Sequence, residues 1–341
     1  MQVVFLGTSS SMPTISRNTS CIALRLDGTI YMFDCGEGVQ RQLHRTPFRQ
    51  KSIDSIFITH MHGDHIFGLP GLLCMIGMTA SPSKRPIEIF GPEGLRQWIR
   101  TTLKLCHAQI PIKYVVHELV LQEWVFMLLD CYRHEDDKYV VVAGLLKHTI
   151  PCWGYVVQER PHAGRFNVER AMEAGVRPGP MYAMLQQGRD VTLRDGTVVK
   201  SADVVGPQRQ GRKVVILGDT SDSRSLLVAA RGADVVVHEA TVTEHEADFA
   251  VDRGHSTASM AGRFAHSINA NTLVLTHFSG KLEGAYYGTS DNGTIKDLIT
   301  AASKSFGKNS VIAAHDLTAV TICRKEDPAF PAHRTTSSFS T

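Results

Sequence analysis

The chain has 341 residues, of which 43% are hydrophobic and 20% charged, proportions typical of a globular protein with a sizeable core. No apolar run reaches the roughly 18 residues that a membrane-spanning helix requires, so we expect no membrane association. The net charge of +3 is too small to indicate a nucleic-acid-binding protein by itself. The seven cysteines are widely spread and include no Cys-x-x-Cys pair, which favours free thiols in a reducing, cytoplasmic setting.

Short β-branched runs alternate with longer amphipathic segments, which is typical of an α/β fold. The runs predict strands at Val3–Leu6, Ile22–Leu26, Ile30–Phe33, Ile56–Thr59, Ile87–Phe90, Val140–Ala143, Val214–Leu217, Val235–Val237, Thr272–Leu275 and Val311–Ala314. The turn Asp27-Gly28 predicts a hairpin between the second and third strands. The amphipathic segments predict helices at Gly68–Ala80, Pro92–Leu105, Ser223–Arg231, Ser256–Ile268 and Thr294–Ser303. We expect one large domain over residues 1–323 and a disordered polar tail over residues 324–341.

The segment Gln158–Arg212 interrupts this alternation. It is rich in glycine, proline, arginine and glutamine and poor in long apolar runs, a composition that predicts an extended surface arm inserted into the domain. It contains nine lysines and arginines against six acidic residues, while the rest of the chain has 27 of each. The whole cationic excess therefore lies on this arm, where it could bind a polyanion or form only a solvated basic face.

The strongest chemical signal is the run Thr59-His60-Met61-His62-Gly63-Asp64-His65, which follows a predicted strand. At a strand end, His60 and His62 can point at one metal ion, while Asp64 and His65 begin the next turn and face a second. Imidazole and carboxylate groups are ligands that suit Zn²⁺. A chance cluster among the 16 histidines of the chain is the alternative, but four potential ligands within six residues favour a metal site.

Two metal ions need more ligands than one loop provides. Isolated candidates follow three later predicted strands, namely His148, Asp219 and His277. Singly, each could be structural, as a core histidine or as an aspartate that caps a turn. Their shared position just past buried strands favours convergence at one edge of a layered sheet structure.

Taken in order, these ligands resemble the pattern of the metallo-β-lactamase superfamily, and within it the chain is similar to the short form of the ribonuclease Z family. The similarity covers roughly residues 1–323 and includes Val4-Phe5-Leu6-Gly7-Thr8, Phe33-Asp34-Cys35-Gly36-Glu37-Gly38, His148 to Tyr155, Gly179-Pro180, His238-Glu239-Ala240-Thr241 and His255-Ser256-Thr257. The resemblance implies an αββα sandwich with an inserted tRNA-binding arm. It also implies a homodimer that removes the 3′ trailer of precursor tRNA by zinc-dependent phosphodiester hydrolysis, leaving a 3′-hydroxyl on the tRNA.

The resemblance assigns the ligands to two zinc ions per subunit. One ion would be held by His60, His62 and His148, the other by Asp64, His65 and His277, and Asp219 would bridge them. Two metal ions suit this reaction because they can serve both the attacking and the leaving oxygen of a phosphodiester.

Three residues are candidates for proton transfer. Asp64 is placed to accept the proton of the attacking water, which is the general-base role that the resemblance implies. His255 would donate a proton to the departing 3′-oxygen, and Glu239 would orient and charge it, as the resemblance implies. A solvent-exposed His255 beside a helix-capping Ser256 is the structural alternative.

Further residues are weaker candidates. On the arm, the resemblance points to substrate binding by Gly179 and Pro180, with the neighbouring Arg177. The loop Asp34-Cys35-Gly36-Glu37-Gly38 could orient metal-bound histidines through Asp34 and Glu37, or merely form a glycine-rich turn. Arg17 and Asn18 could contact a phosphate, although a surface arginine often has no such role.

Two other functions are open at this point. The nearer is another hydrolase of the same superfamily that acts on small phosphodiesters, sulfate esters or thioesters, because a dinuclear site alone does not select a substrate. The long basic insertion argues against it, since a small substrate does not need one. The more distant is a non-catalytic nucleic-acid-binding module, which the complete ligand set argues against.

Overall fold

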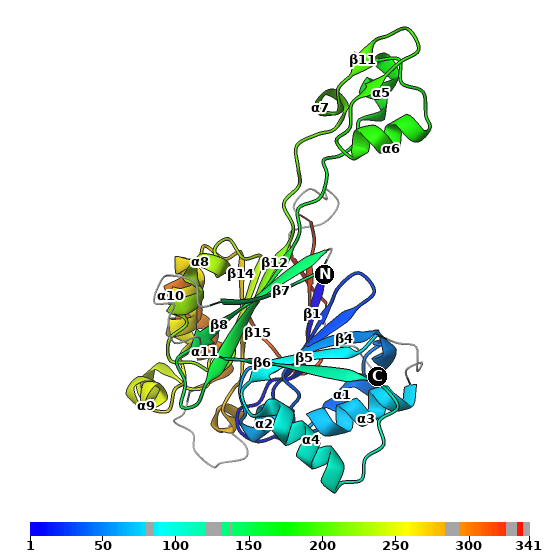
Figure 1. Cartoon of the computed structure of the whole chain (residues 1–341). Helices are drawn as coiled ribbons and strands as arrows, with labels where there is room; N and C mark the ends of the chain where they lie inside the picture. The colour runs from blue at the N-terminus through cyan, green and yellow to red at the C-terminus, as the bar shows by residue number, and fades with distance from the viewer. Residues whose placement is uncertain (80–84, 121–130, 137, 284–292, 325–332, 337–341) are drawn as a thin grey trace. The chain divides into compact units, whose positions relative to one another are not determined.

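Figure 1 shows the computed structural model of the chain, which describes every residue except 80–84, 121–130, 137, 284–292, 325–332 and 337–341. The chain forms two compact units. The larger unit comprises Met1–Glu135, Val140–Val157 and Lys213–Thr341, and the smaller unit comprises Asp136–Tyr139 and Gln158–Arg212. No helix in the described ranges is both long and apolar enough to cross a membrane.

One sheet of the larger unit has eight strands in the order β17-β16-β1-β2-β3-β4-β5-β6. Its strands are β1 (Gln2–Gly7), β2 (Cys21–Arg25), β3 (Ile30–Phe33), β4 (Ile53–Phe57), β5 (Ile87–Pro92), β6 (Tyr114–Leu119), β16 (Ala319–Ile322) and β17 (His333–Thr336). Strands β1 to β3 pair antiparallel and β3 to β6 pair parallel. The predicted hairpin is confirmed between β2 and β3, where Gly28 adopts a φ of 93° that suits glycine.

Helices cover one face of this sheet. They are α1 (Val39–His44), α3 (Leu69–Thr79) and α4 (Leu95–Leu105), with the short α2 (Gly63–Ile66) ahead of α3. Side chains alternate between the two faces along a strand. Ile56 of β4 therefore joins the apolar cluster formed with α1, α3 and α4, whereas Phe57 stacks with Phe33 and Phe90 on the opposite face.

The other sheet has seven strands in the order β15-β14-β13-β12-β9-β8-β7. Its strands are β7 (Cys131–Glu135), β8 (Tyr139–Leu146), β9 (Cys152–Glu159), β12 (Lys213–Ile216), β13 (Val235–Glu239), β14 (Thr272–Thr276) and β15 (Val311–Ala313). Strands β12 to β15 are parallel. The helices of this half are α8 (Leu227–Ala230), α9 (Ala247–Asp252), α10 (Ala258–Ser267) and α11 (Ile295–Phe306). Val215, Val236 and Leu273 form the core beneath α10 and α11.

The two sheets face each other. Tyr155 of β9 contacts the rings of Phe33 and Phe57, and its hydroxyl donates a 2.6 Å hydrogen bond to the carbonyl of Ile58. Helices lie on the outer side of each sheet, as Figure 1 shows. The predicted αββα sandwich is therefore confirmed.

The smaller unit contains α5 (Val168–Glu173), α6 (Pro180–Gln186), α7 (Ser201–Val204) and a hairpin of β10 (Val191–Thr192) and β11 (Val198–Val199). Its inserted part spans Gln158–Arg212. It differs from the extended arm that we expected, because it has a buried apolar cluster of its own, formed by Ala171, Val176, Leu185, Val191, Val199 and Val204. These residues stand singly among polar ones, so the sequence contains no apolar run to reveal them.

Some elements lie where the sequence predicted none. Strands β6 and β9 include glutamate, glutamine, histidine or glycine, which interrupts the β-branched pattern. The helix predicted at Ser223–Arg231 is split into a 3₁₀ turn, η2 (Arg224–Leu226), and α8. Within the tail that we expected to be disordered, β17 pairs antiparallel with β16, because an open strand edge can pair through backbone groups alone. Residues 325–332 and 337–341 of that tail lie outside the described residues.

Candidate active site

The loop that follows β4 holds the histidine motif in a buried position. His60 and His65 are 0% and 2% exposed. Nε2 of His60 lies 3.0 Å from Nδ1 of His62. Asp64 and His65 belong to the first turn of α2, which brings Oδ2 of Asp64 to 3.5 Å from Nε2 of His65.

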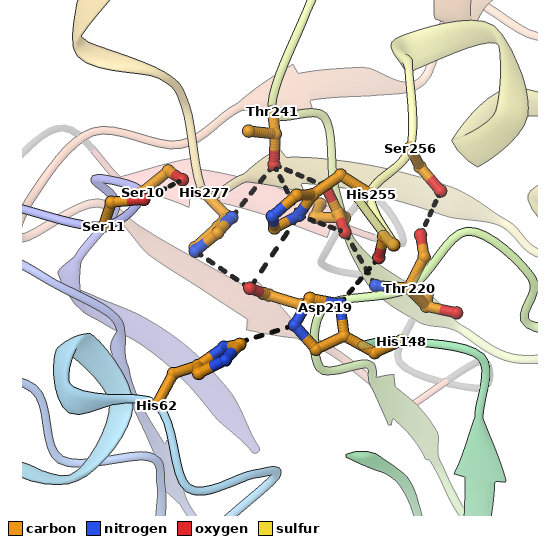
Figure 2. Close-up of polar contacts among 12 residues, drawn as sticks. Ser10, Ser11, His62, His148, Asp219, Thr220, Thr241, His255, Ser256 and His277 are labelled. Atoms are coloured by element: carbon orange, nitrogen blue, oxygen red, sulfur yellow. Dashed lines mark hydrogen bonds and ion pairs between the residues drawn. The ribbon is translucent and has the colours of Figure 1, made fainter. Parts of the chain in front are cut away.

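The three isolated candidates meet this loop, and each follows a strand of the second sheet. His148 follows β8, and its Nε2 lies 3.3 Å from Nδ1 of His62. Asp219 follows β12 and His277 follows β14, and Oδ2 of Asp219 lies 3.4 Å from Nε2 of His277. Figure 2 shows His62, His148, Asp219 and His277 pointing toward one another. The predicted convergence of strand ends is therefore confirmed.

The potential ligands form overlapping groups whose ligand atoms lie within 4.8 Å of one another. They are His60 with His62 and His148, His60 with His65 and Asp219, Asp64 with His65 and His277, and Asp219 with His255 and His277. Oδ2 of Asp219 is 3.7 Å from Nε2 of His60 and 3.5 Å from Nε2 of His65. Asp219 thus lies between a group around His60 and a group around His65, where a bridging ligand would have to be.

Two of the histidines are oriented through Asp34. Nδ1 of His65 donates to Oδ2 of Asp34 at 2.7 Å, and Asp34 also accepts from the hydroxyl of Thr59 at 2.9 Å. The same hydroxyl lies 2.9 Å from Nδ1 of His60. Because the Thr59 hydroxyl donates to Asp34, it accepts from His60 Nδ1. Both imidazoles therefore carry their proton on Nδ1 and turn Nε2 toward the cavity.

The other half of the sandwich orients two more histidines in the same way. Nδ1 of His148 donates to the carbonyl of Gly254 at 2.8 Å. Nδ1 of His277 lies 3.0 Å from the hydroxyl of Thr241, which itself donates to Glu239 and so accepts from the histidine. His148 and His277 thus also direct Nε2 inward, as ligating histidines commonly do.

The donor set fits metal ions. Nε2 of His65 and Nε2 of His277 are buried and have no hydrogen-bond partner among the described residues, a costly arrangement unless a cation lies in the site. Burial lowers the pKa of His65, but the charges of Asp219 and Asp34 raise it well above its usual value. Burial would raise the pKa of Asp219, yet His277 and His65 hold it well below its usual value. The site is therefore built around carboxylate charge and attracts cations.

His255 and Glu239 form a pair beside the ligands. Nδ1 of His255 lies 3.1 Å from Oε1 of Glu239 and 3.9 Å from Oδ2 of Asp219. Burial alone would lower the pKa of His255, but the charge and hydrogen bond of Glu239 raise it to about 9. The backbone N–H of Thr220 and the hydroxyl of Thr241 also donate to Glu239. His255 is thus a fixed, protonated group at neutral pH, and the alternative of a freely exposed histidine is wrong.

Asp64 faces the same space from the first sheet. The backbone N–H of Ser11 donates to its Oδ2 at 2.7 Å, and Nε2 of His277 lies 3.5 Å from the same oxygen. Burial would raise the pKa of Asp64, but the neighbouring His277 and the charge of His65 hold it well below its usual value. Asp64 is ionised at neutral pH and can both ligate and accept a proton.

These groups line a cavity of about 790 Å³. Its lining includes His62, Asp64, His148, Asp219 and His255. Such a volume suits a nucleotide-sized group.

Comparisons with known proteins agree with this geometry. A protein named Ribonuclease Z from Crocosphaera subtropica is 40% identical, and the match covers 93% of this chain and 97% of the relative. The protein named Zinc phosphodiesterase ELAC protein 1 from Mus musculus is also 40% identical, with 82% and 86% covered. The crystal structure of human tRNase Z, short form (ELAC1), matches with a TM-score of 0.67 and 33% identity, covering 95% of this chain and 100% of that one. The chain belongs to the ribonuclease Z family.

Two further comparisons concern the fold. YhfI from Bacillus subtilis, described as a metallo-beta-lactamase fold protein, matches with a TM-score of 0.62 at 16% identity, over 93% of this chain and 98% of that one. The family model for Anti-Pycsar protein Apyc1 matches residues 1–110. That range includes the His60-to-His65 motif but none of the ligands from the second sheet.

Three residues at the active site of this ribonuclease Z family member have a strained backbone conformation. Asp34, His277 and Ser11 have φ values of 57°, 59° and 64°, in the left-handed region that residues other than glycine rarely adopt. Asp34 orients His65, His277 is a ligand candidate, and Ser11 donates to Asp64. Such strain persists where the surrounding contacts fix the backbone, and it is common at functional sites.

The weaker candidates in the larger unit have mixed outcomes. Asp34 makes the contacts that an orienting residue needs, with His65 and Thr59. Glu37 is exposed and contributes its carbonyl, which accepts from Asn18 and Thr19. Arg17 is buried rather than at the surface, and its guanidinium donates to Thr8 and to the carbonyl of Ala314. Its contacts are therefore structural, and the predicted phosphate contact is not what its geometry favours.

The predicted substrate-binding residues lie in the smaller unit. Pro180 is the first residue of α6, a position where proline fits because its missing N–H would be unpaired anyway. Gly179 precedes it as the N-cap, and Arg177 is exposed two residues earlier. They remain predictions as substrate contacts.

Sequence reasoning missed the residues that orient the ligands. Thr59, Thr241 and Gly254 fix three of the histidines, and Ser11 contacts Asp64. Thr59 stands directly before the motif and Thr241 directly follows His238-Glu239-Ala240, so neighbouring hydroxyls were available as a signal. Gly254 contributes a carbonyl, which any residue type has, and no sequence signal could reveal it.

Proposed function

We propose that this protein is a two-zinc endoribonuclease that removes the 3′ trailer of precursor tRNA and leaves a 3′-hydroxyl on the tRNA. The observation that carries the proposal is that seven potential ligands and the His255–Glu239 pair converge at one site. Five of these residues line its cavity, namely His62, Asp64, His148, Asp219 and His255. The membership of the ribonuclease Z family supports hydrolysis of RNA, and the name of the human tRNase Z structure supports tRNA as the substrate.

Zinc is the metal that the donor set favours. Five imidazoles and two carboxylates suit Zn²⁺ better than Mg²⁺ or Ca²⁺, which prefer oxygen ligands. The mouse relative is named a zinc phosphodiesterase. We assign one ion to His60, His62 and His148, a second to Asp64, His65 and His277, and the bridging position to Asp219. When bound, two such ions supply Lewis-acid stabilisation of the phosphate and of both reacting oxygens.

The chain's own residues would carry out the proton transfers. The ionised Asp64, held by Ser11, can accept the proton of the attacking water. His255 is protonated at neutral pH and can donate to the 3′-oxygen as its bond to phosphorus breaks. Glu239 positions His255 and stabilises its positive charge. Protonation of the 3′-oxygen gives the proposed product, a tRNA with a 3′-hydroxyl and a trailer with a 5′-phosphate.

The smaller unit is proposed to bind the body of tRNA through phosphate contacts. Its exposed cations are Arg165, Arg170, Arg177, Arg189, Arg194 and Lys200. By contrast, Arg212 is buried and donates to Glu159 at 2.7 Å, which makes it a structural cation. We further propose a homodimer, as the family resemblance implies.

One experiment tests the proposal directly. The protein is incubated with a 3′-extended precursor tRNA and with a nitrophenyl phosphodiester, the RNA ends are mapped, and zinc is counted per subunit. We expect a cut that leaves a 3′-hydroxyl, two zinc equivalents and, in analytical ultracentrifugation, a dimer. Hydrolysis of the small diester without any cleavage of precursor tRNA would favour the small-phosphodiester hydrolase instead.

A further inference from the structure

One wall of the catalytic cavity carries an exposed aromatic ring beside cations. Phe249 of α9 lines the cavity and is 48% exposed. The guanidinium carbon of Arg253 lies 4.9 Å from the centroid of the Phe249 ring, and the ammonium of Lys281 lies 6.0 Å from it. Lys281 is also paired with Glu246 at 3.2 Å. Phe249 takes no part in the ligand set or in orienting it, so its exposure in the cavity needs another explanation.

The backbone ties this ring to the proton donor. The N–H of Arg253 donates to the carbonyl of Phe249 at 3.1 Å, and the N–H of His255 donates to the carbonyl of Ala250 at 2.7 Å. The turn that ends α9 therefore fixes Phe249, Arg253 and His255 on one short segment. Because His255 is assigned to the leaving 3′-oxygen, the nucleoside that bears this oxygen must lie on the same side of the cavity.

We infer that Phe249 is a stacking platform for the nucleobase on the 5′ side of the cut, with Arg253 extending the stacking surface. This inference rests on the proposed function, which places the 3′-oxygen of that nucleotide beside His255. Every nucleobase has a π-face, so stacking on an aromatic ring holds a nucleotide without requiring one base. A guanidinium beside the ring adds cation–π attraction and a charge suited to the phosphate backbone.

A second exposed aromatic ring in the cavity provides a comparison. Phe67 also lines the cavity and is 65% exposed. It follows α2 and stands close to Gly63, where an added Cβ would come within 2.2 Å of its ring. Phe67 therefore lies beside the residue that precedes Asp64, the proposed acceptor of the water proton. We expect that it does not contact the base whose 3′-oxygen leaves.

The test pairs protein variants with altered substrates. Precursor tRNA is prepared in three forms: unmodified, abasic at the nucleotide 5′ of the cut, and abasic at the nucleotide 3′ of the cut. Wild type, Phe249→Leu, Phe249→Trp and Phe67→Leu are compared by single-turnover kcat/KM. Leucine keeps an apolar side chain but removes the π-face, whereas tryptophan keeps it.

The kcat/KM of wild type should fall about tenfold on the 5′-abasic substrate, which is the usual effect of losing one stacked base. The kcat/KM of Phe249→Leu on unmodified substrate should be about tenfold below that of wild type. Removal of the 5′ base should lower the kcat/KM of this variant almost no further. Phe249→Trp should behave as wild type, and Phe67→Leu should keep the full tenfold sensitivity to the 5′ base. Removal of the 3′ base should affect wild type and Phe249→Leu by the same factor.

The outcomes separate this inference from the proposed function. Unchanged zinc content and an unchanged melting temperature in Phe249→Leu show that the variant is folded. If wild type cleaves precursor tRNA and Phe249→Leu retains the full sensitivity to the 5′ base, the stacking assignment is overturned while the proposed function stands. If wild type does not cleave precursor tRNA at all, the proposed function itself fails.

Discussion

Replacing Asp34 by asparagine should weaken zinc binding without unfolding the chain. Asn keeps the shape of Asp and tolerates the left-handed φ of 57° at this position. Its oxygen can replace Oδ1, which accepts from the backbone N–H of Thr59 at 2.7 Å. Its amide nitrogen would replace Oδ2, which accepts from Nδ1 of His65 and from the hydroxyl of Thr59. The hydroxyl of Thr59 can rotate and accept a hydrogen bond from the asparagine amide. A metal-bound His65 must keep its proton on Nδ1, so its N–H would point at the N–H group of the asparagine and form no hydrogen bond.

Asp34→Asn should therefore lower zinc affinity through the proposed ligand His65. Loss of such an orienting contact commonly lowers metal affinity 10–100-fold, which is about 1.4–2.8 kcal/mol. Competition with a chromophoric chelator measures this affinity, and kcat at saturating zinc should recover most of the wild-type value. Asp234→Asn is the matched control, because Asp234 is also buried and accepts from the backbone of Lys213 and from Asn271, remote from the ligand set. Wild-type zinc affinity in Asp34→Asn would refute the reasoning.

The remaining predictions concern the ligands, the proton donor and the inserted unit. Asp219→Ala should lower zinc content and activity together, and two full zinc equivalents in this variant would contradict the bridging assignment. His255→Ala should keep its zinc yet slow cleavage by roughly 10²–10⁴, with a smaller loss on a nitrophenyl diester whose leaving group needs no proton; an equal loss on both substrates would indicate a structural role. Because His255 must be protonated to donate, activity should fall as pH rises past its pKa of about 9, and Glu239→Gln, which removes the charge that raises this pKa, should move the fall to lower pH. An unchanged pH profile of Glu239→Gln would contradict the role of Glu239 in raising the pKa of His255. Replacing Pro161–Val205 by a flexible linker should severely weaken precursor tRNA cleavage and its salt dependence, but spare zinc content and small-diester hydrolysis, whereas an unchanged rate and salt dependence would place tRNA recognition elsewhere.

The convergence of the proposed metal ligands could be predicted because each of them has a local signal in the sequence. The His60-to-His65 run combines four ligand types in one loop, and His148, Asp219 and His277 each follow a β-branched run that ends in a buried strand. Parallel strands of one sheet end at a common edge, so the positions of Asp219 and His277 after β12 and β14 already imply their proximity. That inference needed only the presence of each strand, and errors of two or three residues in the bounds, as at β4, did not affect it.

The contacts that orient the ligands could not be predicted in this way. Gly254 is 106 residues from His148, and Thr241 is 36 residues from His277. Each pair depends on how two loops meet across the cavity, which strand order alone does not determine. The core of the smaller unit was missed for a related reason, since its apolar residues become neighbours only when three short helices and a hairpin pack together.

The proposed metal centre would also join the two sheets of the sandwich, because His60, His62, Asp64 and His65 come from one half and His148, Asp219 and His277 from the other. A cation held by both halves binds the folded chain and not the unfolded one, so its free energy of binding adds to the stability of the fold. With free zinc at 100 times its Kd, one site contributes about 2.7 kcal/mol. We therefore expect the melting temperature of this protein to depend on the zinc concentration around it, and a chelator to act as a denaturant as well as an inhibitor.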